Sequence, residues 1–312
     1  MKRPYEYTYD HNYFVILIND LLFQISLLIS PFDFINLSLT CKTNHSILYP
    51  LYNKIQQSYL NEKKILMLEH MEKKSISFIL NILSHENKSF IAGSFPLYFI
   101  SNSCYRYNDI DIYLQWDNYK TIEINRIFSV INHKYFKNTI FENTASYCYT
   151  INDDKPSYDI RIMKYAFIKS IKLILTVYPK DYRGEETSTT LQFIFINDKL
   201  NDIETYIYNN FDLSFCKCWF DNKILTCETK NFLNILKKIG IININTIKDR
   251  IDDYGLIVKE LDIKDKYILN FVIPRIMNYT QRGFNIKNLK EFFNSFNYKK
   301  YSGLDLSILG HI

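Results

Sequence analysis

One stretch, residues 90–114, constrains the fold of this chain more than any other. It reads FIAGSFPLYFISNSCYRYNDIDIYL and holds one of the chain's seven glycines. We expect a strand, a tight turn at Gly93 and Ser94, a short apolar helix, and a second strand that begins at Asp109. On that strand the two-residue alternation places Asp109 and Asp111 on one face, about 7 Å apart along the strand. Two carboxylates this close favour a bound cation.

The composition is that of a globular protein. Of the 312 residues, 47% are apolar and 16% aromatic, which leaves room for two or three packed structural units. The net charge of +5 is mild, and no run of five or six like charges occurs, so nucleic-acid binding is allowed but not indicated. The excess of Ile, Asn, Lys and Tyr is typical of an AT-rich genome, such as that of a large DNA virus.

The cysteines and the N-terminus bear on the cellular compartment. Six cysteines without paired spacing indicate free thiols in a reducing environment, and the group Cys216, Cys218 and Cys227 has no histidine near it, so we expect no zinc there. The N-terminus lacks the apolar core of a signal peptide, and the most apolar window, 14–29, is too short to span a bilayer. We therefore expect an intracellular, cytoplasmic protein (in the host cytoplasm if viral) that does not bind a membrane.

The apolar periodicity predicts an α+β chain with an α/β-like core. Its expected parts are a helical segment at 1–60, a connecting helix within 61–86, a strand-rich unit at 87–225 and a helical region at 226–312. In the strand-rich unit we expect a helix at 121–130 and strands at 146–151, 158–163, 171–177, 191–196 and 211–220. In the last part we expect helices at 231–238, 246–261 and 287–296. A helix between two of the strands favours at least one parallel pair, so we predict a mixed sheet with flanking helices.

Residues 14–55 contain a run of short apolar helical patterns. An acid followed by two leucines opens the run, and a Pro-Phe-Asp and an Asn-Leu-Ser-Leu-Thr-Cys-Lys segment follow. This stretch resembles an F-box, although Ile18 and Asn19 replace the expected Leu-Pro. The resemblance implies docking onto the Skp-type adaptor of a cullin ubiquitin ligase through Leu21, Leu22, Ile25, Leu28, Pro31, Leu37, Leu39 and Cys41. The alternative is a helical subdomain that packs on the rest of the chain.

The opening stretch carries a second resemblance. Gly93 and Ser94, fourteen further residues and then Asp109-Ile-Asp111-Ile resemble the signature of the DNA polymerase beta-type nucleotidyltransferase superfamily. The resemblance implies that the Gly-Ser turn holds the phosphates of a nucleoside triphosphate (NTP) and that the two aspartates hold Mg²⁺ or Mn²⁺. The alternative is an amphipathic strand whose two aspartates face solvent. Members of the superfamily modify RNA ends, DNA, proteins and small molecules, so the acceptor stays open.

The superfamily resemblance also implies a third carboxylate on a later strand of the same sheet. Asp159 fits best by pattern, because it lies on a predicted strand with apolar neighbours. Asp212 lies in a segment that resembles one in viral and protist relatives of the superfamily, and this resemblance implies that its acid supports the sheet. A third strand has Gln192 where an acid could stand, and a neutral Gln cannot supply the charge of a two-metal site. If this last strand is the neighbour of Asp109, we expect nucleotide binding without transfer.

Two functions follow from the sequence. The first is metal-dependent transfer of a nucleoside monophosphate from an NTP to an unknown acceptor, with Asp109, Asp111 and Asp159 as metal ligands. The second is an F-box-type adaptor that links clients to the ubiquitin ligase and carries a catalytically inactive nucleotidyltransferase-like body. A helix face formed by Arg275, Tyr279 and Arg282 either contacts phosphates or faces solvent.

Overall fold

The computed structural model describes 42–74, 76–85, 89–102, 107–115, 145–149, 157–165, 170–178, 189–196, 202–257 and 267–296, and the single positions 21, 24, 25, 29, 31, 33, 34 and 265. The chain divides into two compact units, 1–62 and 63–312. In the first unit, Phe34, Leu51 and Ile55 form a small buried cluster with the partly buried Ile29. The predicted helix at 121–130 lies outside the described residues.

The helix that enters the second unit ends earlier than the apolar pattern predicted. Helix α3 spans Lys42–Lys73, and a separate helix α4 spans Phe78–His85. Between them the backbone N–H of Ile76 donates to the carbonyl of Met71 at 2.9 Å, which closes the helix in a tight turn. This turn buries Ile76 completely, so packing of one apolar side chain outweighs continuation of the helix. The single helix expected at 62–84 is therefore wrong in its middle.

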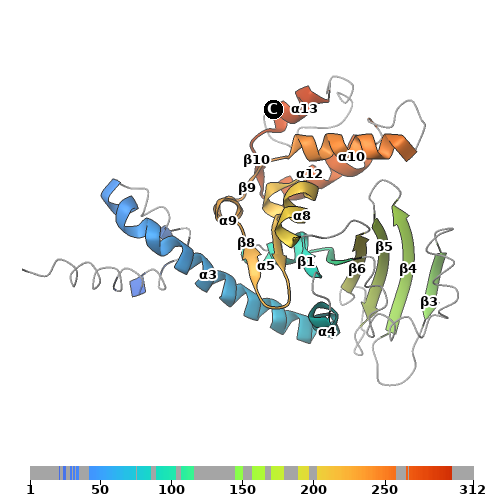
Figure 1. Ribbon diagram of the computed structural model, residues 1–312, viewed down its shortest axis with the longest axis horizontal. Coiled ribbons are helices and arrows are strands. Elements are labelled where there is room, and N and C mark those ends of the chain that lie inside the picture. The colour runs from blue at the N-terminus through green and yellow to red at the C-terminus, as the bar shows by residue number, and fades with distance from the viewer. Residues whose placement is uncertain are drawn as a thin grey trace, which may run out of the picture. The chain divides into compact units, whose positions relative to one another are not determined.

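The second unit is built on a mixed sheet, as expected for the α+β class. The described strands are β1 (Phe90–Ala92), β2 (Asp109–Gln115), β3 (Ala145–Tyr149), β4 (Ser157–Tyr165), β5 (Ser170–Tyr178), β6 (Thr189–Ile196), β7 (Cys218–Phe220) and β8 (Leu225–Cys227). Their order is β3-β4-β5-β6-β2-β1-β7-β8 (Figure 1). Strands β2 and β6 are parallel, whereas the other paired neighbours in this sheet are antiparallel. The parallel pair thus forms between β2 and β6, while β1 and β2, which flank α5 (Ser94–Ile100), are antiparallel.

Burial explains why these segments are strands. On β2, the residues Ile110, Ile112 and Leu114 are fully buried, and the intervening residues Asp109 and Asp111 are partly exposed. Side chains of alternate residues point to opposite faces of a strand, so one face of β2 packs in the core and the other carries the acids. The predicted strands from 146 to 196 match β3 to β6 to within a few residues.

The expected strand at 211–220 is wrong in its first half. A short 3₁₀ helix, η3 (Ser214–Cys216), precedes β7, and β8 follows after a turn at Asp221. The carboxylate of Asp221 accepts hydrogen bonds from the backbone N–H groups of Lys223 and Ile224 at 3.0 and 2.8 Å, which is a strong local turn signal. Helix α8 (Ile203–Asn210), which the sequence reading omitted, begins at an N-cap formed by Asp202.

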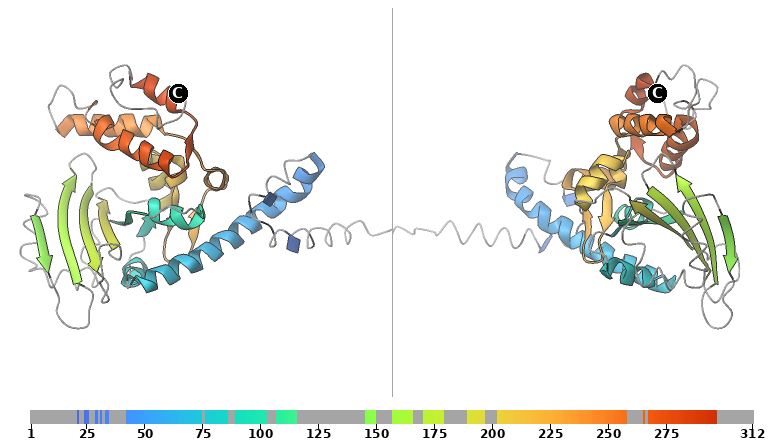
Figure 2. Two further views of the ribbon diagram at one scale, coloured as in Figure 1. Left: turned by 180° about the vertical axis from the view of Figure 1, so that it is seen from behind. Right: turned by 45° about the vertical axis from the view of Figure 1, so that its right-hand side comes forward.

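The C-terminal part is mainly helical, as expected. It contains α9 (Thr229–Leu236), β9 (Ile239–Gly240), α10 (Ile244–Ile257), the π-helix η4 (Ile268–Val272), α12 (Ile273–Gln281), β10 (Asn285–Ile286) and α13 (Leu289–Ser295). Strands β9 and β10 pair in parallel. Figures 1 and 2 show α8, α10 and α12 grouped together near β1. Among the described helices, none has the length and apolar character needed to cross a membrane.

Candidate functional site

The fold brings the Gly-Ser turn against the aspartate pair. Gly93 has φ +86°, a conformation that favours glycine, and it lets the chain turn from β1 into α5. A Cβ atom at Gly93 would lie 3.4 Å from Oδ2 of Asp111, so this position leaves little room for a side chain. The hydroxyl of Ser94 donates a hydrogen bond to the backbone carbonyl of Asp109 at 3.3 Å. All four residues therefore lie in one compact site.

Gln192 is the third side chain at this site. Strand β6 lies parallel to β2, and the register pairs Gln192 with Asp111. Gln192 is buried, and its side-chain nitrogen donates a hydrogen bond to Oδ2 of Asp109. The Gln192 amide is neutral, so it donates through its N–H here and, unlike a carboxylate, brings no negative charge to a bound metal. The position next to the two aspartates thus holds a hydrogen-bond donor.

Asp159 does not join this site, which corrects the expectation of a third carboxylate there. Asp159 lies on β4, and strands β5 and β6 separate β4 from β2. The register runs from Asp159 through Thr176 and Thr190 to Asp109, so three strand spacings, about 14 Å, separate the two backbone positions. The hairpin of β5 and β6 enters the sheet between them, and this insertion is a property of topology that the local pattern does not contain.

Asp212, the second candidate, serves a different purpose. It is 3% exposed, and its Oδ2 accepts a hydrogen bond from Arg275 at 2.8 Å and lies 4.0 Å from Nη1 of Arg250. Burial alone raises the pKa of Asp212, but the two guanidinium charges outweigh burial and hold the pKa below its ordinary value. Its backbone carbonyl also accepts from the N–H of Asn243 at 2.6 Å. Asp212 therefore joins the segment after α8 to α10 and α12.

The donor set suits one divalent cation better than two. Carboxylate oxygens are the ligands that Mg²⁺ and Mn²⁺ prefer, and Asp109 and Asp111 supply them from one strand face. Within the described parts of the chain, no group of three His, Cys, Asp or Glu side chains could hold a metal together. A two-metal centre needs such a third charged ligand, and none of the described residues supplies it beside Asp109 and Asp111.

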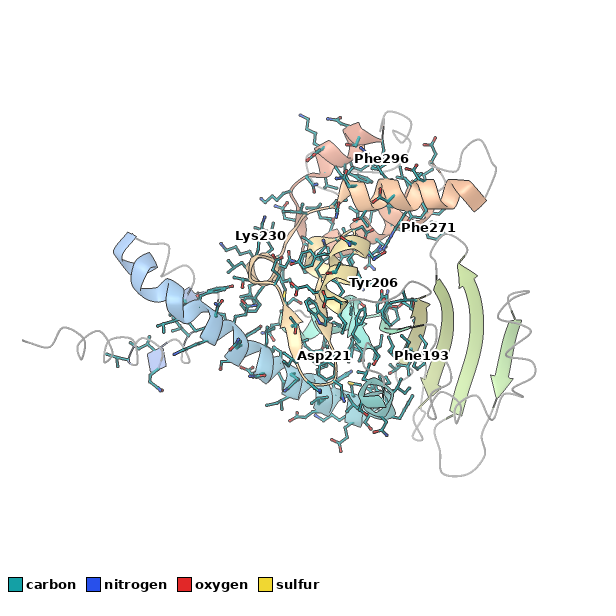
Figure 3. All side chains as sticks on the ribbon, in the orientation of Figure 1. Phe193, Tyr206, Asp221, Lys230, Phe271 and Phe296 are labelled. Carbon is teal, nitrogen blue, oxygen red and sulfur yellow. The ribbon has the colours of Figure 1, made fainter. Side chains whose placement is uncertain are left out.

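Aromatic side chains continue the acid face of β2. Tyr113 stacks on Phe90 with 4.9 Å between ring centroids and lies 6.0 Å from the ring of Tyr206. Figure 3 labels Tyr206, which belongs to α8. Burial raises the pKa of Tyr113 well above its ordinary value, and the charge of Asp111 raises it further. The hydroxyl of Tyr113 therefore stays protonated and can act as a hydrogen-bond donor beside the acids.

A histidine and a tyrosine fix the start of β2. The Nε2 atom of His70 on α3 lies 2.5 Å from the hydroxyl of Tyr107, two residues before Asp109. The rings of Phe95 and Phe99 on α5 also contact His70, with centroids 6.3 and 5.6 Å away. Burial lowers the pKa of His70, and Lys74 and Lys73 lower it further, which favours the neutral ring. These contacts tie the acid pair to α3 and α5.

The F-box-like residues are only partly described. Leu21 and Ile25 are helical, and 61% and 39% of their surface is exposed. Pro31 is helical and partly buried. The remaining expected adaptor contacts lie outside the described residues: Leu22, Leu28, Leu37, Leu39 and Cys41.

A cavity of about 470 Å³ lies away from the aspartate pair. Polar residues of α8, α9, α10 and α13 line it, and Lys217 and Glu228 contribute opposite charges. Lys217 donates to the backbone carbonyl of Tyr208 at 3.0 Å, so this lysine is already bonded within the protein. The acid pair and Gln192 are not part of this cavity, and their closeness rests on the hydrogen bonds and the strand register given above.

The pattern of aspartates and glycine was readable in the sequence, whereas the partners of these residues were not. Gln192 was a candidate neighbour, but the side chain that pairs with Asp212 was not identified, because Arg275 lies 63 residues away along the chain. Comparisons of the chain with protein-family models, with curated proteins and with solved structures gave no significant match.

Proposed function

We propose that residues 87–225 form a nucleotidyltransferase-type domain that binds an NTP together with one divalent cation and does not transfer the nucleotide. The observation that carries this proposal is the hydrogen bond from the amide of Gln192 to the carboxylate of Asp109. The Gln192 side chain lies where transfer of a nucleotide would need a third carboxylate. Between the two functions derived from the sequence, this geometry favours the inactive body.

The binding half of the site supports the proposal. Asp109 and Asp111 would hold the cation through their carboxylate oxygens, and a bound cation would neutralise the phosphate charge beside them. Gly93 lets the backbone turn close to Asp111, so a phosphate bound to the cation would lie beside this turn. The Ser94 hydroxyl fixes the strand that carries the acids. Each residue thus acts in binding, and none is assigned a proton-transfer step.

Calorimetric titration of the full chain with each of the four NTPs, in the presence of Mg²⁺ or Mn²⁺, tests binding. We expect saturable binding that the double variant Asp109→Asn/Asp111→Asn abolishes. A matched control is Asp249→Asn/Asp252→Asn, which removes two exposed carboxylates from α10 and should leave the affinity unchanged. Well-folded protein that binds none of the four nucleotides would disprove the proposal.

Transfer is tested separately with radiolabelled NTPs and RNA, DNA, protein and small-molecule acceptors. We expect no label to leave the nucleotide pool at any metal concentration, because the site lacks the charge of a second metal centre. Incorporation of label that the Asp109→Asn/Asp111→Asn variant abolishes would instead establish the domain as an active transferase.

A second function is favoured by the exposure of Leu21 and Ile25. These residues are four apart and helical, so they lie on the same face of a helix, and both expose much of their apolar surface. We propose that this face binds the Skp-type adaptor of a cullin ubiquitin ligase. The nucleotidyltransferase-like body would then select the client. The two proposals are compatible, because they concern different segments of the chain.

Co-purification with the adaptor from cells tests this second proposal. The variant Leu21→Asp/Ile25→Asp should reduce adaptor binding at least about tenfold, since each buried aliphatic side chain contributes about 1.5–3 kcal/mol. Gln24→Asp on the same segment is the matched control, because Gln24 is also exposed and helical. Equal recovery of the adaptor with both variants would contradict the proposal.

A further inference from the structure

One face of α12 is partly buried against the body of the protein and partly exposed. Arg275, Tyr279 and Arg282 lie four and three residues apart, so they share one side of the helix. The Tyr279 side chain is 6% exposed and accepts a hydrogen bond from Cys216 at 3.4 Å. The guanidinium of Arg282 lies 5.1 Å from the centre of the Tyr279 ring. The helix face expected either to contact phosphates or to face solvent is therefore packed at Tyr279, while Arg275 and Arg282 keep part of their surface exposed.

Each end of this face reaches one end of the acid strand. Arg282 donates to the side-chain carbonyl of Asn108 at 3.4 Å, and Asn108 directly precedes Asp109. Arg275 donates a hydrogen bond to the carboxylate of Asp212. Asp212 directly follows Phe211 in the chain. The Phe211 ring in turn lies 5.7 Å from the ring of Tyr113, two residues after Asp111. Arg282 thus lies beside the start of the segment that carries the carboxylates, and Arg275 is linked to the other end through Asp212, Phe211 and Tyr113.

Around Asp212, positively charged side chains outnumber negatively charged ones. Among the described residues, the guanidinium groups of Arg250 and Arg275 share the single carboxylate of Asp212. Both arginines lower the pKa of Tyr113 while Asp111 raises it, so charges of both signs act on the same hydroxyl. The Arg275 side chain is 42% exposed, which leaves part of its guanidinium accessible. A guanidinium has five N–H donors, and one carboxylate does not use them all.

We propose that Arg275 and Arg282 bind the phosphate groups of the nucleotide whose cation Asp109 and Asp111 hold, and so select polyphosphates over monophosphates. This inference rests on the proposed nucleotide binding. Carboxylates on the strand side match the cation, and arginines on the helix side match the phosphates. Because Arg282 lies beside the start of the acid segment and Arg275 is linked to its other end, a chain of two or three phosphates fits both, whereas a single phosphate reaches one.

The test measures the affinity of the full chain for a nucleoside triphosphate, the matching monophosphate and inorganic triphosphate, each with Mg²⁺. Arg282→Gln should weaken binding of both triphosphates about tenfold and change monophosphate binding less than about twofold. Lys290→Gln is the charge-matched control, because Lys290 is exposed on α13 and should leave all three affinities unchanged. The inorganic triphosphate separates recognition of phosphates from recognition of the base and sugar.

Arg275→Gln alone leaves Asp212 buried without its closest cation and could unfold the chain. The double variant Asp212→Asn/Arg275→Gln removes both partners, and its fold is checked by circular dichroism. We expect it to lose triphosphate affinity to a similar extent as Arg282→Gln. Triphosphate binding that depends on Asp109 and Asp111 but is unchanged in both arginine variants would overturn this inference and leave the proposed function standing. Absence of nucleotide and triphosphate binding in the unmodified chain would overturn both.

Discussion

Gln192 affects how stable the pair of Asp109 and Asp111 is when no cation is bound. A third carboxylate beside Asp109 and Asp111 would add like-charge repulsion of about 1–4 kcal/mol per pair at 4 Å, depending on the local dielectric. The Gln192 amide removes that repulsion, and its hydrogen bond to an ionised acceptor contributes about 1.5–3 kcal/mol. The observed side chain therefore stabilises the metal-free site, whereas a carboxylate would favour the metal-bound one.

Gln192→Glu reverses this balance. We expect the metal-free variant to lose about 1–3 kcal/mol of unfolding free energy, because three acids then share the site. Its affinity for Mn²⁺ should rise at least about tenfold. Thermal unfolding with and without Mn²⁺ measures both effects. Gln192→Leu is the control, since it loses the hydrogen bond without gaining a charge; an equal response of the two variants to Mn²⁺ would contradict the assignment.

Gly93→Ala tests the turn that carries the phosphate-binding assignment. The backbone at Gly93 has φ +86° and ψ −134°, which an alanine adopts only with strain, and the new methyl would lie against Asp111. We expect a loss of about 1–3 kcal/mol in urea unfolding. Ser94→Ala should cost less, about 0.5–1.5 kcal/mol, because it removes one hydrogen bond. A larger loss for Ser94→Ala than for Gly93→Ala would argue against strain at the turn.

At the scale of elements, Asp212 is the contact that connects the sheet to the helices of the C-terminal part. It follows α8, its side chain bonds Arg275 on α12, and its backbone bonds the residue before α10. Removing one partner of a buried ion pair typically costs about 3–5 kcal/mol, because the remaining charge stays buried. This carboxylate is therefore one of the contacts that place α12 and, with it, both arginines of the proposed phosphate site.

The ion pair predicts a specific pH dependence. The folded-state pKa of Asp212 is below its ordinary value of 3.8, so its stabilising effect is complete above that value and is lost as the pH falls through the lowered pKa. Urea unfolding at pH 7 should show Asp212→Asn to be less stable than the unmodified chain by about 3–5 kcal/mol. This difference should shrink as the pH falls below 3.8. A difference that stays constant down to pH 3 would contradict the assignment.

At the scale of the whole molecule, the chain combines two compact units, and the candidate sites are divided between them. The exposed pair Leu21 and Ile25 belongs to 1–62, and the acid pair belongs to 63–312. The described core of the larger unit draws its buried side chains from the C-terminal end of α3 through α13. Each unit thus has its own buried side chains. A substitution or deletion in one unit can therefore remove one proposed binding activity and leave the other.

Deleting residues 1–41 tests this separation. The shortened chain begins at Lys42 and keeps the whole of α3, so no described core residue of 63–312 is lost. We expect unchanged nucleotide affinity, a change in unfolding free energy of the larger unit below about 0.5 kcal/mol, and loss of the adaptor. Calorimetry and co-purification measure these outcomes. Loss of nucleotide binding by the shortened chain would show that the units depend on each other.

Local patterns in the amino-acid sequence were enough to predict the elements around the acid pair. Alternation along 109–114 predicted a strand with a buried and an acidic face, and Gly93 marked the turn before an apolar helix. These features are local: side-chain direction has a period of two in a strand, and a positive φ favours glycine whatever lies around it. The α+β class and the strands from 145 to 196 followed from the same kind of signal.

The tertiary structure decided which residues stand beside the acids. Gln192 is 83 residues from Asp109 in the chain, and it lies next to the site because β6, and not β4, pairs with β2. Asp159 has the better local pattern, yet the β5 and β6 hairpin separates it from Asp109. The order of strands in a sheet is set by packing of the whole core and by the connections between elements, and a pattern within one strand does not contain that information.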